Sequence, residues 1–257
     1  MRIGLQLRDG SESGLARAAE QFGMFGILAG ADNALTAITA ACYASVATQR
    51  IRIAVRVGLG LEHPITIAEE LSVLDNISNG RVVVVIDTRE MDAEAAREEL
   101  SIIQSALACR PFKHHGTHFD LPAFLPGNEE ASSTIMVTPK PVQVQVPFWA
   151  IGRVAPQVVH QEGIPLVVES PADCDSAMLV QPGVQSITCA LEEDRRAVIE
   201  WAAAGATHLL MRIPEQQEVT ATLRYVARYL IPEVAMPDYP RIMSESRVPF
   251  PWPGPEE

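Results

Sequence analysis

Residues 82–86 read Val-Val-Val-Val-Ile, an apolar run without a polar side chain. A strand in a parallel sheet is buried on both faces and has this composition, whereas a strand with one solvated face alternates apolar and polar residues. Before this run a helical pattern begins at Pro64 and stops at Gly80, and after it a second helical pattern reaches residues 100–107. The stretch therefore predicts a buried parallel strand between two helices.

The alternation of strand and helix continues in both directions. We predict eight strands, over residues 3–7, 26–30, 51–59, 82–86, 148–152, 165–169, 185–190 and 208–213. Helices are predicted between them, among others over residues 35–48, 155–161, 192–204 and 217–230. This order indicates an α/β protein with a parallel sheet wrapped by helices, and 257 residues match a (β/α)8 TIM-type barrel of about 250 residues. We expect one barrel domain over residues 1–231 and a proline-rich, irregular tail over residues 232–257.

Composition restricts the class of partner. The chain has 20 Lys and Arg against 32 Asp and Glu, a net charge of −12 that repels nucleic-acid phosphates. No apolar run approaches the roughly 20 residues of a membrane span, and the N-terminus turns polar too soon for a signal peptide. The four cysteines lie far apart, which suits reduced thiols. We therefore expect a cytoplasmic protein without a nucleic-acid or membrane partner.

Three groups of segments resemble motifs of one known family and follow one another along the chain in the order that the family has. Residues 63–81 read HPITIAEELSVLDNISNGR, residues 116–119 read GTHF and are followed by related motifs up to residue 152, and the third group comprises the N-terminal strand, residues 25–30 and residues 204–210. The chain resembles a shortened, divergent luciferase-like flavin- or deazaflavin-dependent monooxygenase. The resemblance implies a barrel, and compared with the family this chain has shortened loops or helices on the C-terminal face of that barrel. It also implies FMN or a deazaflavin there, a small organic substrate, and a homo-oligomer or a heterodimer with a related barrel.

The first cofactor loop of that family is altered in this chain. After the fourth strand the family has a Gly-x-Gly-x-Gly run, because a ring and a phosphate need close approach to the backbone. This chain has Val85, Asp87 and Arg89 at those positions. Arg89 or Thr88 can still contact a phosphate, whereas Asp87 repels one unless it faces elsewhere. The alternative is that Asp87, Arg89 and Glu90 form a solvated ion-pair loop.

Other loops carry the remaining candidate site residues. After the fifth strand, Gly152 matches a family glycine, and Arg153 either binds a phosphate or caps a helix at the surface. Gly58 lies where the family backbone bends beside the flavin ring, or is an ordinary strand-end glycine. Asp32 and Asn33 follow the second strand. Asn33 replaces a titratable histidine, which leaves Asp32 as the candidate general base.

Histidines form a second cluster, His114, His115 and His118. Two of them would suit a metal on a helix, but a proline and a glycine in the segment oppose a helix, and we predict no metal site. His63 is predicted to anchor a helix start and Trp149 to belong to the barrel core.

Two classes of function are consistent with these sequence features. The first is an oxidoreductase or monooxygenase that uses a reduced flavin or deazaflavin. The second is a non-catalytic barrel that serves as a structural or regulatory subunit without bound flavin, which the altered loops favour. A weaker third is a binder of a small ligand.

Overall fold

The computed structural model describes residues 1–7, 12–30, 36–88, 91–108, 110–123, 134–152, 155–159, 163–175, 180–214 and 217–234. Its strands are β1 (Arg2–Gln6), β2 (Gly26–Ala29), β3 (Arg52–Gly58), β4 (Val82–Asp87), β5 (His114–His115), β6 (Asp120–Leu121), β7 (Phe148–Ile151), β8 (Pro182–Ser186) and β9 (His208–Arg212). Its helices are α1 (Glu12–Gln21), α2 (Ala37–Ala47), α3 (Pro64–Ser78), α4 (Ala93–Leu107), α5 (Ala155–Val159), α6 (Leu191–Ala203), α7 (Val219–Tyr225) and α8 (Ile231–Val234). A 3-10 turn, η1 (Pro171–Asp173), and a π turn, η2 (Val226–Leu230), complete the regular elements of the described chain.

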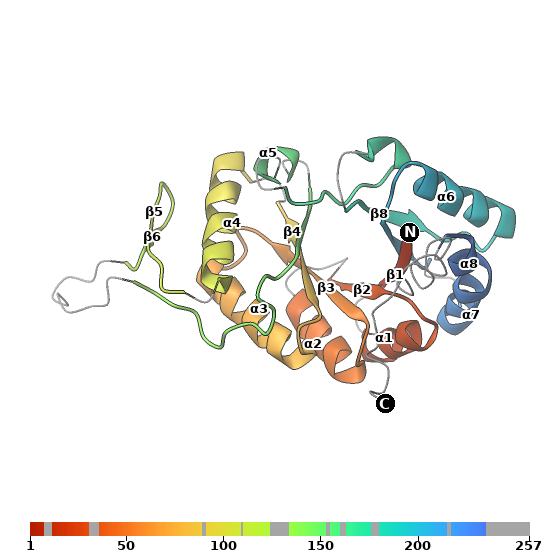
Figure 1. The fold of residues 1–257 in the computed structure, drawn as a ribbon, viewed down its shortest axis with the longest axis horizontal. Coiled ribbons are helices and arrows are strands. Elements are labelled where there is room, and N and C mark those ends of the chain that lie inside the picture. The colour runs from red at the N-terminus through yellow and green to blue at the C-terminus, as the bar shows by residue number, and fades with distance from the viewer. Residues whose placement is uncertain are drawn as a thin grey trace, which may run out of the picture.

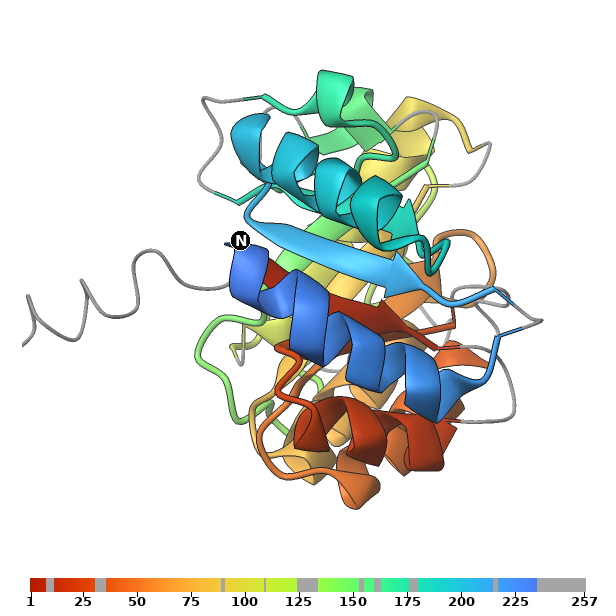
Figure 2. The ribbon, with the colours of Figure 1, turned by 90° about the vertical axis from the view of Figure 1, so that its right-hand side faces the viewer.

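Seven of the strands form one parallel sheet in the order β7-β4-β3-β2-β1-β9-β8. The sheet curls, and the helices lie around its outer side (Figure 1). Figure 2 shows β9 between α6 and the α7–α8 segment, with its arrowhead toward the carboxyl edge of the sheet. The short α5 and the single turn η1 stand where full helices would cover a complete barrel, which confirms the prediction of shortened elements.

The eighth position of the barrel is filled by residues 165–168. The Ala150 N–H donates to the Pro165 carbonyl at 2.9 Å, and the Val167 N–H donates back to the Ala150 carbonyl at 2.8 Å. On the other side the Val168 N–H donates to the Pro182 carbonyl and the Val184 N–H to the Val168 carbonyl, both at 3.0 Å. The predicted strand over 165–169 is therefore a pair of parallel bridges rather than a regular strand. It joins β7 to β8 and confirms the TIM-type barrel.

Side chains alternate between the lumen of the barrel and the layer under the helices. Val83 and Val85 belong to a small lumen cluster with Leu28, Trp149 and Leu210. The larger cluster lies between the sheet and the helices and includes Val84. The uninterrupted apolar run of β4 is thus explained by burial on both faces.

Strand β8 lies three residues before its predicted start. It begins at Pro182, which pairs in register with His208, although proline and glycine oppose a strand in a sequence pattern. Gly183 is required because a Cβ there would lie 2.5 Å from the Trp201 ring. The Trp201 Nε1 donates to Gln185 Oε1 at 2.9 Å, so packing of α6 decides where this strand lies.

The last helical segment is longer than predicted. It continues through Pro232 to Val234, and the Ile231 N–H bonds to the Val226 carbonyl, five residues back. Proline has no N–H to donate and its ring clashes with the carbonyl four residues earlier, so the wider π turn accommodates it. The predicted helix end at residue 230 is therefore four residues early, and residues 235–257, the remainder of the predicted tail, lie outside the described residues.

The most family-like block, residues 63–81, proves to be structural. His63 caps α3 by accepting the Ile65 N–H at Nδ1, as predicted, and Asn79 ends the helix at φ 56°. The buried Asp75 accepts the Gln143 backbone N–H at 2.9 Å, and Arg81 donates to the Ser45 carbonyl at 2.8 Å. These contacts join α3 to neighbouring segments at the amino edge of the barrel.

The excursion after α4 includes the hairpin β5–β6, which projects beyond α4 in Figure 1. The Glu98 carboxylate on α4 accepts the backbone N–H groups of His118 and Phe119 at 3.0 and 2.9 Å and contacts His114 Nε2 at 3.0 Å. These contacts keep the pKa of Glu98 below its ordinary value, although burial opposes them. Among the described residues, no helix is long and apolar enough to cross a membrane.

Candidate functional site

The carboxyl ends of β3, β4 and β7 meet at one edge of the barrel, and four predicted site residues lie there. Gly58 is the register partner of Asp87, and Asp87 is the partner of Ile151, which precedes Gly152. Thr88 follows Asp87 directly. The structure therefore brings these four residues together. Residues Asp32, Asn33, Arg89 and Arg153 lie outside the described residues, so their roles stay predictions.

Asp87 is buried, with 6% of its surface exposed, and lies on the lumen side together with Val83 and Val85. Its Oδ2 accepts Nε and Nη2 of Arg56 at 3.1 and 2.8 Å. Arg56 follows Ala54 by two residues on β3 and so also faces the lumen. The alternative of a solvated loop is wrong for Asp87, because strand alternation turns its carboxylate inward to a partner on the neighbouring strand.

Thr88 lies on the opposite side of the strand end and is fully buried. Its N–H donates to the Ile151 carbonyl at 3.0 Å, and its hydroxyl lies 3.4 Å from the same oxygen. These bonds connect the end of β4 to β7. A contact between the Thr88 hydroxyl and a cofactor phosphate stays a prediction.

Two further polar residues face the lumen at the carboxyl edge. Gln6 ends β1 and is only 8% exposed, and its register partner is Arg212 at the end of β9, whose side chain reaches solvent. In the part of the chain that the structure describes, the Gln6 carboxamide makes no hydrogen bond. Polar residues within the apolar strands 3–7 and 51–59 were the signal that could have identified Gln6 and Arg56 in the sequence.

Glycines at the same edge bring the backbone close to the opening. Gly30, Gly60 and Gly152 have φ values of 74°, 75° and 117°, which side chains rarely permit. A Cβ at Gly60 would also lie 3.0 Å from Met91 Sδ. The buried Glu99 accepts the Gly60 N–H at 2.9 Å, and burial raises the pKa of this carboxyl. The loop after β3 is therefore held in place from α4.

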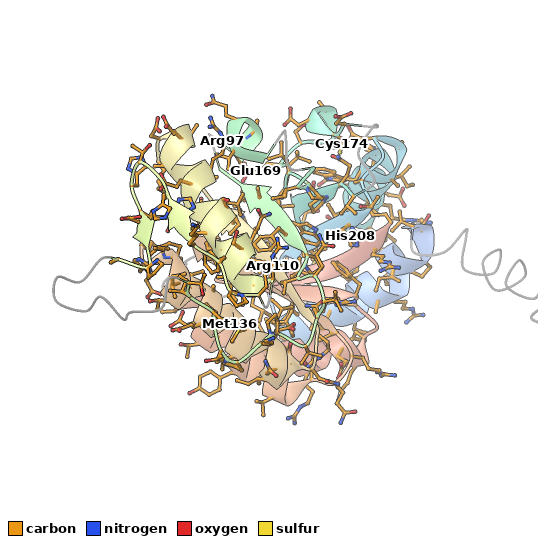
Figure 3. The ribbon with its side chains drawn as sticks, turned by 60° about the vertical axis from the view of Figure 1, so that its left-hand side comes forward. Arg97, Arg110, Met136, Glu169, Cys174 and His208 are labelled. Atoms are coloured by element: carbon orange, nitrogen blue, oxygen red, sulfur yellow. The ribbon has the colours of Figure 1, made fainter. Side chains whose placement is uncertain are left out.

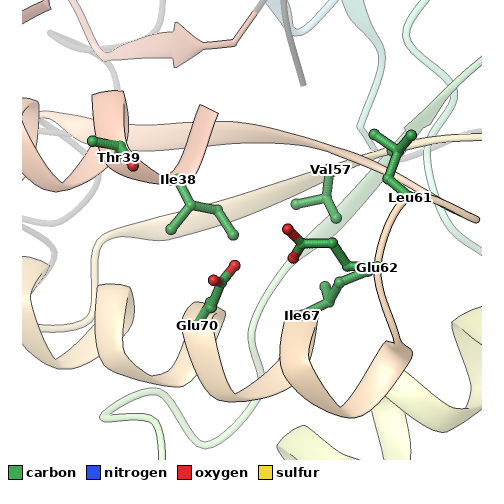
Figure 4. Close-up of a pocket in the computed structure, with 8 residues that line it drawn as sticks. Ile38, Thr39, Val57, Leu61, Glu62, Ile67 and Glu70 are labelled. Carbon is green, nitrogen blue, oxygen red and sulfur yellow. The ribbon is translucent and has the colours of Figure 1, made fainter. Parts of the chain in front are cut away.

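A cavity of about 80 Å³ adjoins this edge on the outer side of β3, between α2 and α3. Figure 4 shows the carboxylates of Glu62 and Glu70 directed into it. Burial raises the pKa of Glu70, and the negative charge of Glu62 raises it further. The rest of the cavity wall consists of Thr39, Gly58 and the apolar side chains of Ile38, Val57, Leu61 and Ile67.

The amino end of the lumen is closed by aromatic side chains. The His208 ring, at the start of β9 (Figure 3), lies 4.8 Å from the Phe25 ring and 5.4 Å from the Trp149 ring between centroids. Burial lowers the pKa of His208 to about 4, and the positive charges of Arg2 and the N-terminus contribute. Trp149 is 5% exposed, which confirms its predicted place in the core.

The histidine cluster is divided between two carboxylates. His114 contacts Glu98 on α4, and His115 contacts Asp120 across the β5–β6 hairpin. Within the described ranges, no three His, Cys, Asp or Glu side chains come together as metal ligands would. Hairpin geometry rather than a helix therefore positions these rings.

Comparisons with known proteins agree with this architecture. The family model of the luciferase-like monooxygenases matches residues 10–164, more than half of the chain. The fold is similar to a coenzyme F420-dependent tetrahydromethanopterin reductase from Methanopyrus kandleri, with a TM-score of 0.71, 14% identity, and coverage of 91% of this chain and 99% of the other. It is also similar to monooxygenase RslO1 from Streptomyces bottropensis, with a TM-score of 0.65, 17% identity, and coverage of 90% and 99%. A search of curated proteins gives no significant match.

Proposed function

Because the chain belongs to the luciferase-like monooxygenase family, we propose that it is an oxidoreductase that uses FMN or a deazaflavin to oxidise or hydroxylate a small organic substrate in the cytoplasm. The observation that carries this proposal is the opening at the carboxyl edge of the barrel. Polar side chains and positive-φ glycines gather there above an apolar lumen. Active sites of this fold lie at that edge, because loops after the strands converge on it.

The residues of the opening fit such a cofactor. Gly60 and Gly152 bring backbone near the opening without a side chain, which suits a planar ring and a phosphate. Asp87, whose charge opposes a phosphate, has that charge balanced by Arg56. We propose that Gly58 and Gly152, with Arg89 and Arg153 from the adjoining loops, hold the cofactor.

The division of labour follows from the family. When bound, the flavin or deazaflavin supplies the redox chemistry. The chain binds and orients both reactants, excludes water from the apolar lumen and moves protons. For the last task we propose Asp32 as general base, with Asn33 beside it orienting the substrate.

A second candidate is a non-catalytic barrel that acts as a structural or regulatory subunit. The replacement of family glycines by Asp87 and neighbouring side chains favours it, as does the hydroxyl of Thr88, which is buried against Ile151. This candidate predicts that no flavin binds.

Cofactor binding separates the two candidates. We expect the purified chain to bind FMN or F420 in calorimetric titration, and Arg153→Ala to weaken that binding about tenfold by removing a phosphate contact. Arg196→Ala changes an exposed arginine on α6 and is the matched control. Binding of neither compound to the wild-type chain would reject the enzyme in favour of the non-catalytic barrel. An unchanged affinity in Arg153→Ala would remove that residue from the site.

A further inference from the structure

The loop between β3 and α3 borders the proposed cofactor site, and its turn is exposed at Gly60. The Leu59 N–H donates to the Asp87 carbonyl at 3.0 Å and continues the pairing of β3 with β4 by one residue. Gly60 follows with a φ of 75°, a conformation outside the β region. Pairing with β4 therefore fixes the loop as far as Leu59, and contacts from outside the sheet fix Gly60.

These contacts come from α4 and from the residues before it. The Glu99 carboxylate accepts the Gly60 N–H, with N···O distances of 3.2 Å to Oε1 and 2.9 Å to Oε2. Met91 packs beside the turn, because its Sδ lies 3.0 Å from the position that a Cβ of Gly60 would take. Gly60 therefore has one polar contact with α4 and no room for a side chain of its own.

Glu99 is not explained by the packing of its helix. Only 1% of its surface is exposed, and within the described ranges the Gly60 N–H is the one group that donates a hydrogen bond to its carboxylate. Burial raises the pKa of Glu99, and the Gly60 N–H opposes this only in part. A buried carboxylate with so little compensation is unfavourable, and an apolar side chain would suit the core better. Residues that break a rule of packing in this way are expected where a site needs them.

The neighbouring Glu98 shows the ordinary arrangement. Burial alone would raise its pKa, but His114 and the N–H groups of Phe119 and His118 outweigh burial and lower it. These three groups compensate the charge of Glu98 and attach the β5–β6 hairpin to α4. Two adjacent glutamates thus hold two different segments, and only Glu99 does so with a single backbone N–H as donor in the described chain.

The turn that Glu99 holds is rich in glycine. Glycine allows close approach of a ligand to the backbone, but it also has the greatest conformational freedom of all residues. A loop that is ordered only when a ligand binds lowers the affinity, whereas a loop that is already ordered does not. A contact that orders residues 58–60 in the free chain therefore favours binding at this edge of the barrel.

We propose that Glu99 is a positioning residue of the cofactor site. Through the Gly60 N–H it keeps the backbone of residues 58–60 in the conformation that receives the ring of FMN or a deazaflavin. This role rests on the proposed function, because it requires a cofactor at the carboxyl edge. Glu99 is buried on α4 behind the loop, so it acts on binding through Gly60 and not by contact with the cofactor.

Two substitutions at Glu99 separate positioning from stabilisation. Glu99→Met keeps the length of the side chain but removes the acceptor of the Gly60 N–H, whereas the amide oxygen in Glu99→Gln still accepts it. In Glu99→Met we expect the calorimetric affinity for FMN or F420 to fall about tenfold. Hydrogen exchange of the peptide that contains Gly60, measured without cofactor, should become about tenfold faster. In Glu99→Gln both quantities should stay within about threefold of wild type.

Thermal unfolding shows whether Glu99 serves the fold instead. The midpoint of unfolding without cofactor should not fall in Glu99→Met, because the unfavourable burial of the carboxylate is removed together with its hydrogen bond. A lower midpoint with unchanged cofactor affinity would show a purely structural role. Glu94→Met, in the exposed first turn of the same helix, is the matched control and should leave affinity and exchange unchanged.

The contrary results are distinct. Equal cofactor affinity in wild type and Glu99→Met would overturn this role alone and would leave the oxidoreductase in place. A loss of affinity in Glu99→Gln as large as that in Glu99→Met would also overturn it, because the hydrogen bond to Gly60 would then not be the cause. A wild-type chain that binds neither FMN nor F420 would reject the oxidoreductase and this role with it.

Discussion

The two ends of the barrel are built from the same strands and differ in almost every property. At the amino end Phe25, Trp149 and His208 pack ring against ring and close the lumen. At the carboxyl end the opening is polar, with the ion pair between Arg56 and the buried Asp87 and with the side chain of Gln6. A packed aromatic cluster stabilises a fold, whereas buried polar groups stabilise it little and are kept where a site needs them. The contrast assigns stability to the closed end and the proposed ligand site to the open end.

The largest effect should come from the closed end. Trp149→Ala removes a buried ring and is expected to lower the free energy of unfolding by about 3–5 kcal/mol, through lost burial and the cavity left behind. Urea unfolding measures this change. A loss below about 1 kcal/mol would mean that the aromatic cluster is not what stabilises this end.

A smaller effect should follow from separating the ion pair at the open end. Arg56→Met removes the guanidinium that balances the buried Asp87, and we expect a loss of about 2–3 kcal/mol, reduced from the fully buried case because Arg56 is partly exposed. The double change Arg56→Met with Asp87→Leu should return to within about 1 kcal/mol of wild type, because no charge is then left without its partner. Additive losses in this double-mutant cycle would show that the two side chains contribute independently and that their ion pair contributes no coupling energy.

The effect that is smallest at neutral pH concerns the protonation of the closed end. The pKa of His208 is about 4 in the folded chain against an ordinary value of 6.5, so the folded state keeps the neutral ring. Its contribution is complete above pH 6.5 and is lost as the pH falls toward 4, by at most about 3 kcal/mol.

His208→Phe keeps an aromatic ring beside Phe25 and Trp149 but removes this titration. The difference in unfolding free energy between variant and wild type, measured at pH 7 and at pH 4.5, should therefore shift in favour of the variant at the lower pH. Carboxylates that titrate in the same range act in both proteins and cancel in the difference. An unchanged difference would show that His208 does not titrate with a lowered pKa.

The order of elements was predictable because it rests on local patterns. The apolar run of β4 and the helix from Pro64 to Asn79 are set by residues close in the chain, and both were located correctly. The sequence pattern failed where a contact between residues far apart in the chain decides the position of a strand. Strand β8 begins at Pro182 because Trp201 packs on Gly183, and neither residue signals the other in sequence.

The candidate site divides in the same way. Gly58, Asp87, Thr88 and Gly152 could be assigned to one edge because strand ends of a parallel barrel converge there. The partner of Asp87 could not be assigned from the sequence. Arg56 lies 31 positions away, and its pairing with Asp87 depends on which side of each strand faces the lumen.

The amino-acid sequence alone therefore determines the family, the barrel and the edge at which a ligand is expected. Strand and helix periodicity are local, and the family motifs are contiguous. Only the tertiary structure decides that Asp87 is buried and that Arg56 is bound to it. Closing the barrel turns alternate side chains of distant strands toward one common lumen, and no local pattern contains that information.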